Sequence, residues 1–207
     1  PCAACFNRFK TAEHNLKSDK DLKARIEEVL GAKYQGGISI RNPIDVIYNE
    51  IGLDALAAKV TRPMTGLKPV SYYGCLLLRP PEVCQFENYE NPFMLDKIMG
   101  ALGADVKNWS YKTDCCGGSL SVSKTPIVTN LCDKLMRAAR EAGANCVVVA
   151  CPMCMANLEM RPSRNMKMPV FYFTELISLA MGLPGSKDTF KSHLIDPQPL
   201  LKQLRLI

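Results

Sequence analysis

Apolar residues recur at helical spacing in the first part of the chain. Within residues 19–30 they return every three or four positions, and Gly31 follows as a stop signal. A second helix is predicted to begin near Asn42–Pro43 and to continue through "NPIDVIYNEIGLDALAAKV". The next stretch, "RPMTGLKP", has no periodicity and is rich in proline and glycine. It predicts a linker, with a domain boundary near residue 66.

Beyond residue 66 the pattern alternates between short β-prone runs and amphipathic segments. The runs that predict strands are "PVSYYGC", "VKNWSY", "NCVVVACPMC" and the start of "MPVFYFTELISLAMGLP". The segments with helical spacing are "PFMLDKIMGALG", "PIVTNLCDKLMRAAREAGA" and residues 174–183. Alternation of this kind predicts an α/β fold with a mostly parallel sheet flanked by helices. Binding sites in such sheets form beyond the carboxyl ends of the strands.

Cysteines follow three of the predicted strands. Cys75 ends the first run, Cys115–Cys116 comes after the second, and Cys151 and Cys154 come after the third. The sequence therefore predicts that all five thiols converge on one edge of the sheet.

Composition places the chain among soluble globular proteins. Of its 207 residues, 47% are apolar and 22% are charged, which are ordinary values. No run of 18 apolar residues predicts a membrane span, and the start lacks the pattern of a signal peptide. The net charge of +6 is scattered, without a basic tract that carries interleaved aromatics, so nucleic acid is not an expected partner.

Ten cysteines are the unusual feature of this composition. Without a secretory signal, metal or redox chemistry is a better expectation than a disulfide framework. Adjacent thiolates at Cys115 and Cys116 are awkward for one tetrahedral zinc and suit a cluster of several metal atoms. Gly117 and Gly118 let backbone N–H groups approach cluster sulfur. A structural zinc, or buried or disulfide-bonded cysteines, remain the alternatives.

The opening "CAACFNRFK" repeats a later pattern. "CPMCMANLE" is followed by proline, an apolar stretch and a helix that reaches Gly-Leu, and "NPIDVIYNEIGL" follows the first pair in the same way. Cys2 and Cys5 therefore indicate the tail of a repeat whose earlier parts are not in this chain.

The spacing of the five strand-end cysteines resembles the CCG domain found in the B-type subunit of heterodisulfide reductase. The matching residues are Cys75, the "CCGG" that starts at Cys115, and the "CPMC" that starts at Cys151. Family members usually carry two such domains, and Cys2 and Cys5 match the closing Cys-x-x-Cys of the first. The resemblance implies that residues 1–65 are the mainly helical tail of a first, incomplete CCG repeat. Residues 66–185 would be a complete CCG domain, and residues 186–207 would be a C-terminal extension. The chain would then be the C-terminal part of a longer protein.

The resemblance also implies a cofactor, a noncubane 4Fe–4S cluster. Its ligands would be the five cysteines named above, and Cys2 and Cys5 would be partial ligands of a first, incomplete site. We expect aerobic purification to remove iron from so exposed a cluster.

The function implied by the resemblance is that of an oxidoreductase acting on a sulfur group. In the family, a disulfide is cleaved between two clusters with electrons from an iron–sulfur partner of the C type, and a flavin would belong to a partner of the A type. The substrate would be a disulfide or thiol, the fragment alone would be inactive, and the location would be cytoplasmic or peripheral to a membrane through partners. The alternative is a non-catalytic redox or anchoring module of a fumarate-, glycolate- or lactate-type oxidoreductase.

The sequence predicts simpler roles for the remaining cysteines, the two histidines and the cations near the cysteine loops. Cys132 and Cys146 are predicted to be buried structural thiols, whereas Cys84 could be a spare thiol near the cluster. His14 and His193 are assigned no role. Four cations flank the cysteine loops and are expected to be solvated, with contact to an anionic disulfide as the alternative: Lys112, Lys124, Arg161 and Arg164.

Overall fold

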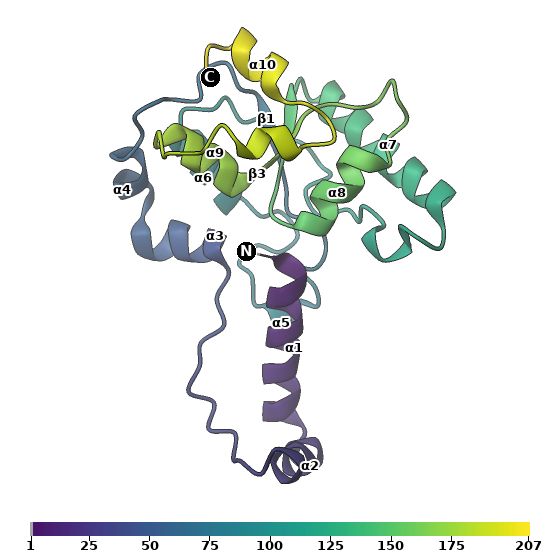
Figure 1. Ribbon diagram of the computed structural model, residues 1–207. Coiled ribbons are helices and arrows are strands. Elements are labelled where there is room, and N and C mark those ends of the chain that lie inside the picture. The colour runs from purple at the N-terminus through teal and green to yellow at the C-terminus, as the bar shows by residue number, and fades with distance from the viewer. Residues whose placement is uncertain (1) are drawn as a thin grey trace.

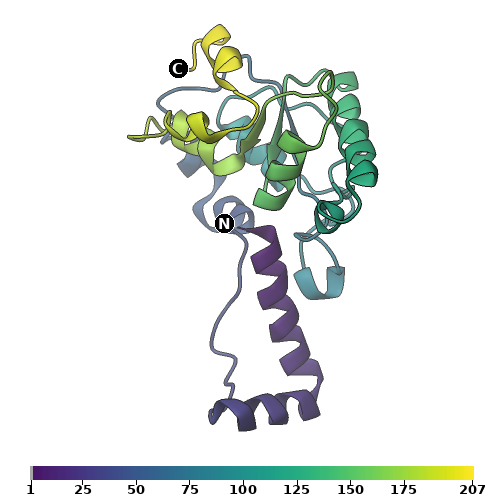
Figure 2. The same ribbon diagram turned by 45° about the vertical axis from the view of Figure 1, so that its right-hand side comes forward.

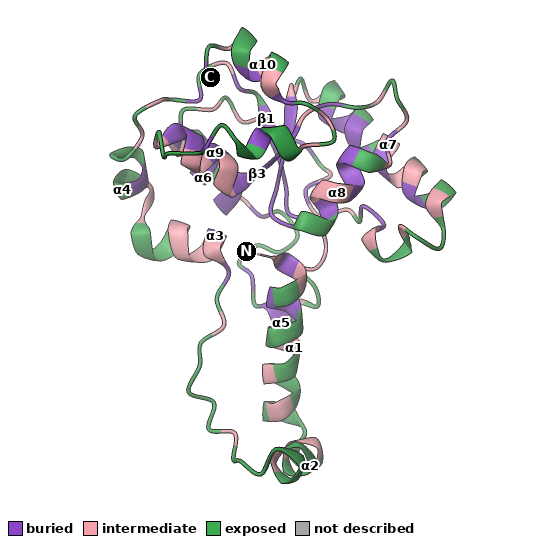
Figure 3. Cartoon of the chain, viewed as in Figure 1, coloured by how far each residue is buried: buried purple, intermediate pink, exposed green. Residues whose placement is uncertain are grey.

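The computed structural model describes residues 2–207 and contains a three-stranded parallel sheet in the order β1-β2-β3. The strands are β1 (Pro69–Tyr72), β2 (Cys146–Val149) and β3 (Val170–Tyr172). All three are buried, as their continuous apolar runs require in a parallel sheet covered on both faces (Figure 3). The predicted α/β fold is confirmed.

Helices flank this sheet on both sides. Figure 1 shows α7 (Thr125–Glu141) and α8 (Pro152–Met160) on one side, with α6 (Met94–Ala101) and α9 (Phe173–Ala180) on the other. The amphipathic segments of the sequence are confirmed as α6, α7 and α9, and α9 buries Phe173, Leu176, Leu179 and Ala180 rather than exposing an apolar face.

The N-terminal helices form an arm that projects from this body (Figures 1 and 2). It consists of α1 (Ala3–Ser18) and α2 (Lys20–Leu30). Asp19 caps α2 by accepting a hydrogen bond from the Leu22 N–H, and Gly31 ends it at φ 63°, as the sequence predicts. No residue of α2 is buried, whereas α1 buries Ala3, Phe6 and Asn7 where it meets the body (Figure 3).

The second predicted helix is interrupted. It consists of α3 (Pro43–Val46), a π-helical turn η1 (Ile47–Ile51) and α4 (Leu53–Ala57). The break falls at Gly52, whose φ of 82° and ψ of 151° are open to glycine and not to a helical residue. The prediction of one continuous helix here is wrong.

The strand predicted at residues 106–111 is also absent from the structure. This segment runs beside β1, and the Lys107 N–H donates to the Pro69 carbonyl. At Ser71, however, the backbone acceptor is taken by the indole N–H of Trp109 at 2.8 Å. Because a side chain occupies the position of a ladder hydrogen bond, no regular strand forms, and Cys115–Cys116 follow a loop instead.

Short elements complete the chain. The C-terminal segment packs back onto the core, where Phe190 meets Phe171 edge to face and Leu201 is fully buried. The division at residues 66 and 186 stays a prediction. The remaining elements are α5 (Pro81–Cys84), η2 (Gly118–Leu120), η3 (Thr189–Ser192) and α10 (Gln198–Gln203).

Candidate metal centre

Five cysteines line one pocket beyond the carboxyl ends of β1 and β2. Cys75 follows β1 through Gly74, Cys151 is the N-cap of α8 directly after β2, and the loop before η2 contributes the adjacent pair. The pocket has a volume of about 50 Å³. Its lining consists of Tyr73, Cys75, Leu76, Cys115, Cys116, Gly118, Ser119, Cys151, Met153 and Cys154. Residues from three separate parts of the sequence thus meet where the sequence predicts a site.

The thiols are arranged as hydrogen-bonded pairs. Cys75 Sγ lies 3.8 Å from Cys115 Sγ, and Cys116 Sγ lies 3.5 Å from Cys154 Sγ. Hydrogen bonding among Cys116, Cys151 and Cys154 raises the pKa of Cys154 and lowers the pKa values of Cys116 and Cys151. The sulfurs are therefore close enough to share one polynuclear centre.

Backbone N–H groups of the glycine loop point at these sulfurs. The Gly117 N–H donates to Cys115 Sγ at 3.3 Å. The pKa of Cys115 is lowered to about 6, chiefly by the hydrogen bond from Cys75 and then by the Gly117 and Gly118 N–H groups, against the opposing effect of burial. Gly117 has a φ of 77°, and a Cβ there would lie 3.1 Å from both Leu131 and Val128. Glycine therefore allows this loop to turn its amides toward sulfur.

Cys151 gains its hydrogen bonds from two helix N-termini. Its pKa is lowered to about 6, first by the Cys154 thiol and then, against burial, by the N–H groups of Cys154, Met153 and Ala4. Ala4 belongs to the first turn of α1, which Cys2 caps by accepting from the Cys5 N–H at 3.4 Å. The structure therefore brings the Cys2–Cys5 pair next to Cys151, although neither lines the pocket.

The other cysteines lie outside this pocket. Cys132 and Cys146 are fully buried, as predicted, and burial raises the pKa of Cys132 to about 12. Cys84 is also buried, and its sulfur accepts a hydrogen bond from Asn7 Nδ2 at 3.3 Å. The sequence left open that Cys84 is a spare thiol near the cluster, but Cys84 does not line the pocket.

Sequence reasoning missed or misjudged several polar residues around the site. Lys112, expected to be solvated, is buried and pairs with Asp96 at 3.1 Å. His193, assigned no role, is buried between two carboxylates, with Glu159 at 2.8 Å and Glu175 at 3.0 Å. Asn157 is buried against the Cys116 loop. Its position three residues after Cys154, on the same face of a helix, is the signal that could have found it.

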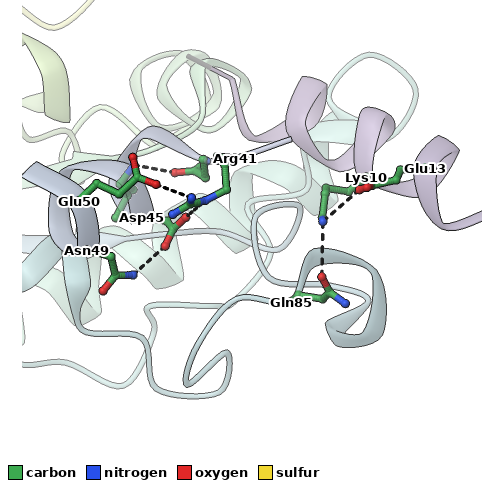
Figure 4. Close-up of polar contacts among 9 residues, drawn as sticks. Lys10, Glu13, Arg41, Asp45, Asn49, Glu50 and Gln85 are labelled. Atoms are coloured by element: carbon green, nitrogen blue, oxygen red, sulfur yellow. Dashed lines mark hydrogen bonds and ion pairs between the residues drawn. The ribbon is translucent and has the colours of Figure 1, made fainter. Parts of the chain in front are cut away.

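A larger hollow of about 290 Å³ lies between α1, residues 40–49 and the turn after α5. Figure 4 shows that its cations are already paired, Arg41 with Asp45 and Glu50, and Lys10 with Glu13 and Gln85. Among the residues that line it, the cations are therefore engaged within the chain.

The cysteine pocket fits an iron–sulfur cluster by the chemistry of its donors. Five soft sulfur ligands and several backbone N–H groups converge there, and both kinds of group are used to hold and tune such clusters. Within residues 2–207, no three His, Cys, Asp or Glu side chains form a compact single-metal set. In the same residues, no helix has the length and apolar character needed to cross a membrane.

Comparison with known proteins agrees with this pocket. Residues 70–159, which hold all five cysteines, match the CCG family of cysteine-rich domains. The chain is 28% identical to the B-type subunit of a ferredoxin/F420H2-dependent CoB-CoM heterodisulfide reductase from Methanosarcina acetivorans, over 87% of this chain and 64% of the relative. It is 27% identical to the membrane anchor subunit of an 8-methylmenaquinol:fumarate reductase from Wolinella succinogenes, over 96% of this chain and 72% of that protein.

A third relative is a protein from Archaeoglobus profundus named for its likeness to the B-type subunit of heterodisulfide reductase. It is 26% identical over 90% of this chain and 67% of its own length. The chain thus spans about two thirds of the length of these relatives. The sequence resemblance and the converged cysteines agree. Residues 70–159 are thus similar to CCG cysteine-rich domains, and most of the chain is similar to B-type subunits of heterodisulfide reductase.

Proposed function

We propose that this chain is the iron–sulfur subunit of a heterodisulfide reductase-like complex. The observation that carries the proposal is the convergence of five thiols on one pocket at the sheet edge. Cys75, Cys115, Cys116, Cys151 and Cys154 would hold a noncubane 4Fe–4S cluster, which when bound would supply electrons for cleaving a disulfide. Cys2 and Cys5, next to Cys151, would contribute two ligands of a further site.

The chain's own residues prepare the pocket for this role. The Gly117 and Gly118 N–H groups and the N-terminus of α8 stabilise negative charge on Cys115, Cys116 and Cys151. Cys75 and Cys154 are hydrogen-bonded to these sulfurs, have raised pKa values and would lose their protons when metal binds. A disulfide substrate would approach from the Cys2–Cys5 side, and two-electron cleavage releases two thiols with two protons taken from solvent.

Partners follow from the same proposal. Electrons would come from a second iron–sulfur protein of the complex, and a flavoprotein would complete it. The isolated chain would bind its cluster without turnover. A non-catalytic redox or anchoring module is the second candidate, favoured by the similarity to a membrane anchor subunit over 96% of the chain. In that case the reconstituted complex would transfer electrons and leave disulfides intact.

The deciding measurement is iron, zinc and acid-labile sulfide per chain after anaerobic purification and reconstitution. We expect about four irons with matching sulfide, lost in Cys116→Ser because a hydroxyl is a poor ligand for iron in such clusters. Cys84→Ser is the matched control, since this buried thiol lies outside the pocket. One tightly bound zinc without sulfide, unaffected by Cys116→Ser, would contradict the proposal and support a structural zinc domain.

A further inference from the structure

Asn157 joins the Cys-x-x-Cys helix to the adjacent-cysteine loop. It lies on α8 one turn after Cys154 and is 2% exposed. Its Nδ2 lies 3.1 Å from the Cys116 carbonyl oxygen and 3.7 Å from Cys116 Sγ. The amide has two N–H bonds, so one can donate to the carbonyl and the other to the sulfur.

The orientation of this amide is fixed by its neighbours. Ser121 Oγ lies 2.7 Å from Asn157 Oδ1, and Arg161 Nε donates to Ser121 Oγ at 3.1 Å. A guanidinium only donates, so the single hydroxyl hydrogen of Ser121 is left for Asn157 Oδ1. The Cys116 carbonyl only accepts, so Nδ2 must face it. The reversed amide would lose the hydrogen bond to the Cys116 carbonyl and place two acceptor oxygens against each other.

Cys132 holds the same carbonyl from another helix. Its side chain is fully buried on α7, and its sulfur lies 3.6 Å from the Cys116 carbonyl oxygen and 3.8 Å from that of Asn157. The backbone of Cys116 is thus held from α7 and α8, while its sulfur faces the pocket and Cys154.

We propose that Asn157 is a positioning residue that donates a hydrogen bond to the Cys116 sulfur and raises the reduction potential of the cluster. Ser121 fixes the amide, and the positive charge of Arg161 polarises the chain of hydrogen bonds toward Cys116. The inference rests on the proposed function, in which Cys116 is a cluster ligand. Reduction adds negative charge to the ligand sulfurs, so a donor stabilises the reduced state more than the oxidised one.

The test is a redox titration of the anaerobically reconstituted chain, followed by EPR, with iron and sulfide measured on each sample. Asn157→Leu removes the donor and should shift the midpoint potential to more negative values at unchanged iron content. Asn157→Asp should shift it further, because a carboxylate adds negative charge. Asn145→Leu is the control. Asn145 also bridges backbone groups, donating to the Gly66 carbonyl and accepting from the Lys68 N–H, but at the opposite end of the strands.

Two further variants decide the matter if Asn157→Leu fails to hold the cluster. Ser121→Ala and Arg161→Gln change side chains whose hydrogen bonds reach Cys116 only through Asn157, and each should give a smaller negative shift. Midpoint potentials equal to that of the wild type in these variants, with full clusters, would overturn the inference. A wild-type chain that takes up no iron and sulfide would instead remove the proposed function, and this inference with it.

Discussion

The five pocket thiols differ in their hydrogen-bonding roles, residue by residue. Three of them accept hydrogen bonds and have lowered pKa values: Cys115, Cys116 and Cys151. The other two, Cys75 and Cys154, are hydrogen-bonded to these sulfurs and have raised pKa values. The adjacent pair and the N-cap cysteine are therefore the thiols that the fold itself prepares as thiolates.

His193 is a buried residue whose charge matters for stability. Burial would lower its pKa, but hydrogen bonds to Glu159 and Glu175 outweigh burial and raise the pKa to about 9. The same carboxylates also accept from the Leu194 and Tyr172 N–H groups. The protonated imidazole thus ties the C-terminal segment to α8 and α9, and through α8 to the cysteine pocket.

This histidine makes stability dependent on pH. Because its folded-state pKa lies above the unfolded value of about 6.5, its contribution is complete below pH 6.5 and is lost as pH rises through 9. We expect His193→Gln to cost about 1 to 3 kcal/mol of unfolding free energy at pH 6 and much less at pH 9.5. Urea unfolding at both pH values measures this, with the exposed His14→Gln as control. An equal cost at both pH values would mean that the imidazole acts by packing alone.

At the scale of elements, the pattern of apolar and turn residues predicted the helices and strands whose formation depends on their own stretch of sequence. The β1, β2 and β3 runs and the helices α6, α7 and α9 follow from periodicity and turn residues. The supposed strand at residues 106–111 failed because its pairing with β1 is replaced by a Trp109 side-chain hydrogen bond, which no local pattern shows.

The candidate site follows the same rule. Cysteine spacing predicted which thiols meet, although Cys115 and Cys116 follow a loop and not the expected strand. The hydrogen bonds from Asn157 to Cys116 and from His193 to Glu159 join residues 34 to 41 positions apart in sequence, so only the folded chain reveals them. Lys112 was expected at the surface because the sequence does not show that Asp96 and the Pro92 carbonyl face it across the core.

The turn between β1 and Cys75 gives a prediction at this scale. Gly74 has a φ of 68°, and a Cβ there would lie 3.1 Å from Cys154 Sγ. Gly74→Ala should therefore cost about 1 to 2 kcal/mol in backbone strain and also displace a cluster ligand. Gly143→Ala is the matched control, since its φ is 79° and none of the described residues other than its two chain neighbours lies within 4 Å of the added Cβ.

Iron content distinguishes the two glycine variants. Thermal unfolding should show both to be less stable than the wild type, because both place alanine at positive φ. Reconstitution should show fewer irons per chain in Gly74→Ala alone. If the two variants bind equal amounts of iron, the contact of Gly74 with Cys154 has no bearing on the site.

At the scale of the whole molecule, the arm meets the body at the candidate metal centre. The first turn of α1 donates the Ala4 N–H to Cys151. The Asn7 side chain holds this end in place, because its Nδ2 donates to the Leu76 carbonyl at 3.0 Å and to the Arg79 carbonyl at 2.8 Å. The rest of the arm projects away from the body (Figure 2). Together with the buried Ala3 and Phe6, the Asn7 amide therefore holds Cys2 and Cys5 beside the pocket.

Removing that amide should loosen α1 without unfolding the sheet. Asn7→Ala deletes the hydrogen bonds to both carbonyls and the polar contact with Cys84 Sγ, which lowers the free energy of local opening by about 1 to 3 kcal/mol. Hydrogen exchange of the α1 amides should then quicken by roughly 5- to 150-fold, while the amides of β2 exchange as before. Asn15→Ala is the control, an exposed asparagine on the same helix. If both variants exchange alike, contacts other than Asn7 hold α1, and Cys2 and Cys5 would keep their place beside Cys151 without it.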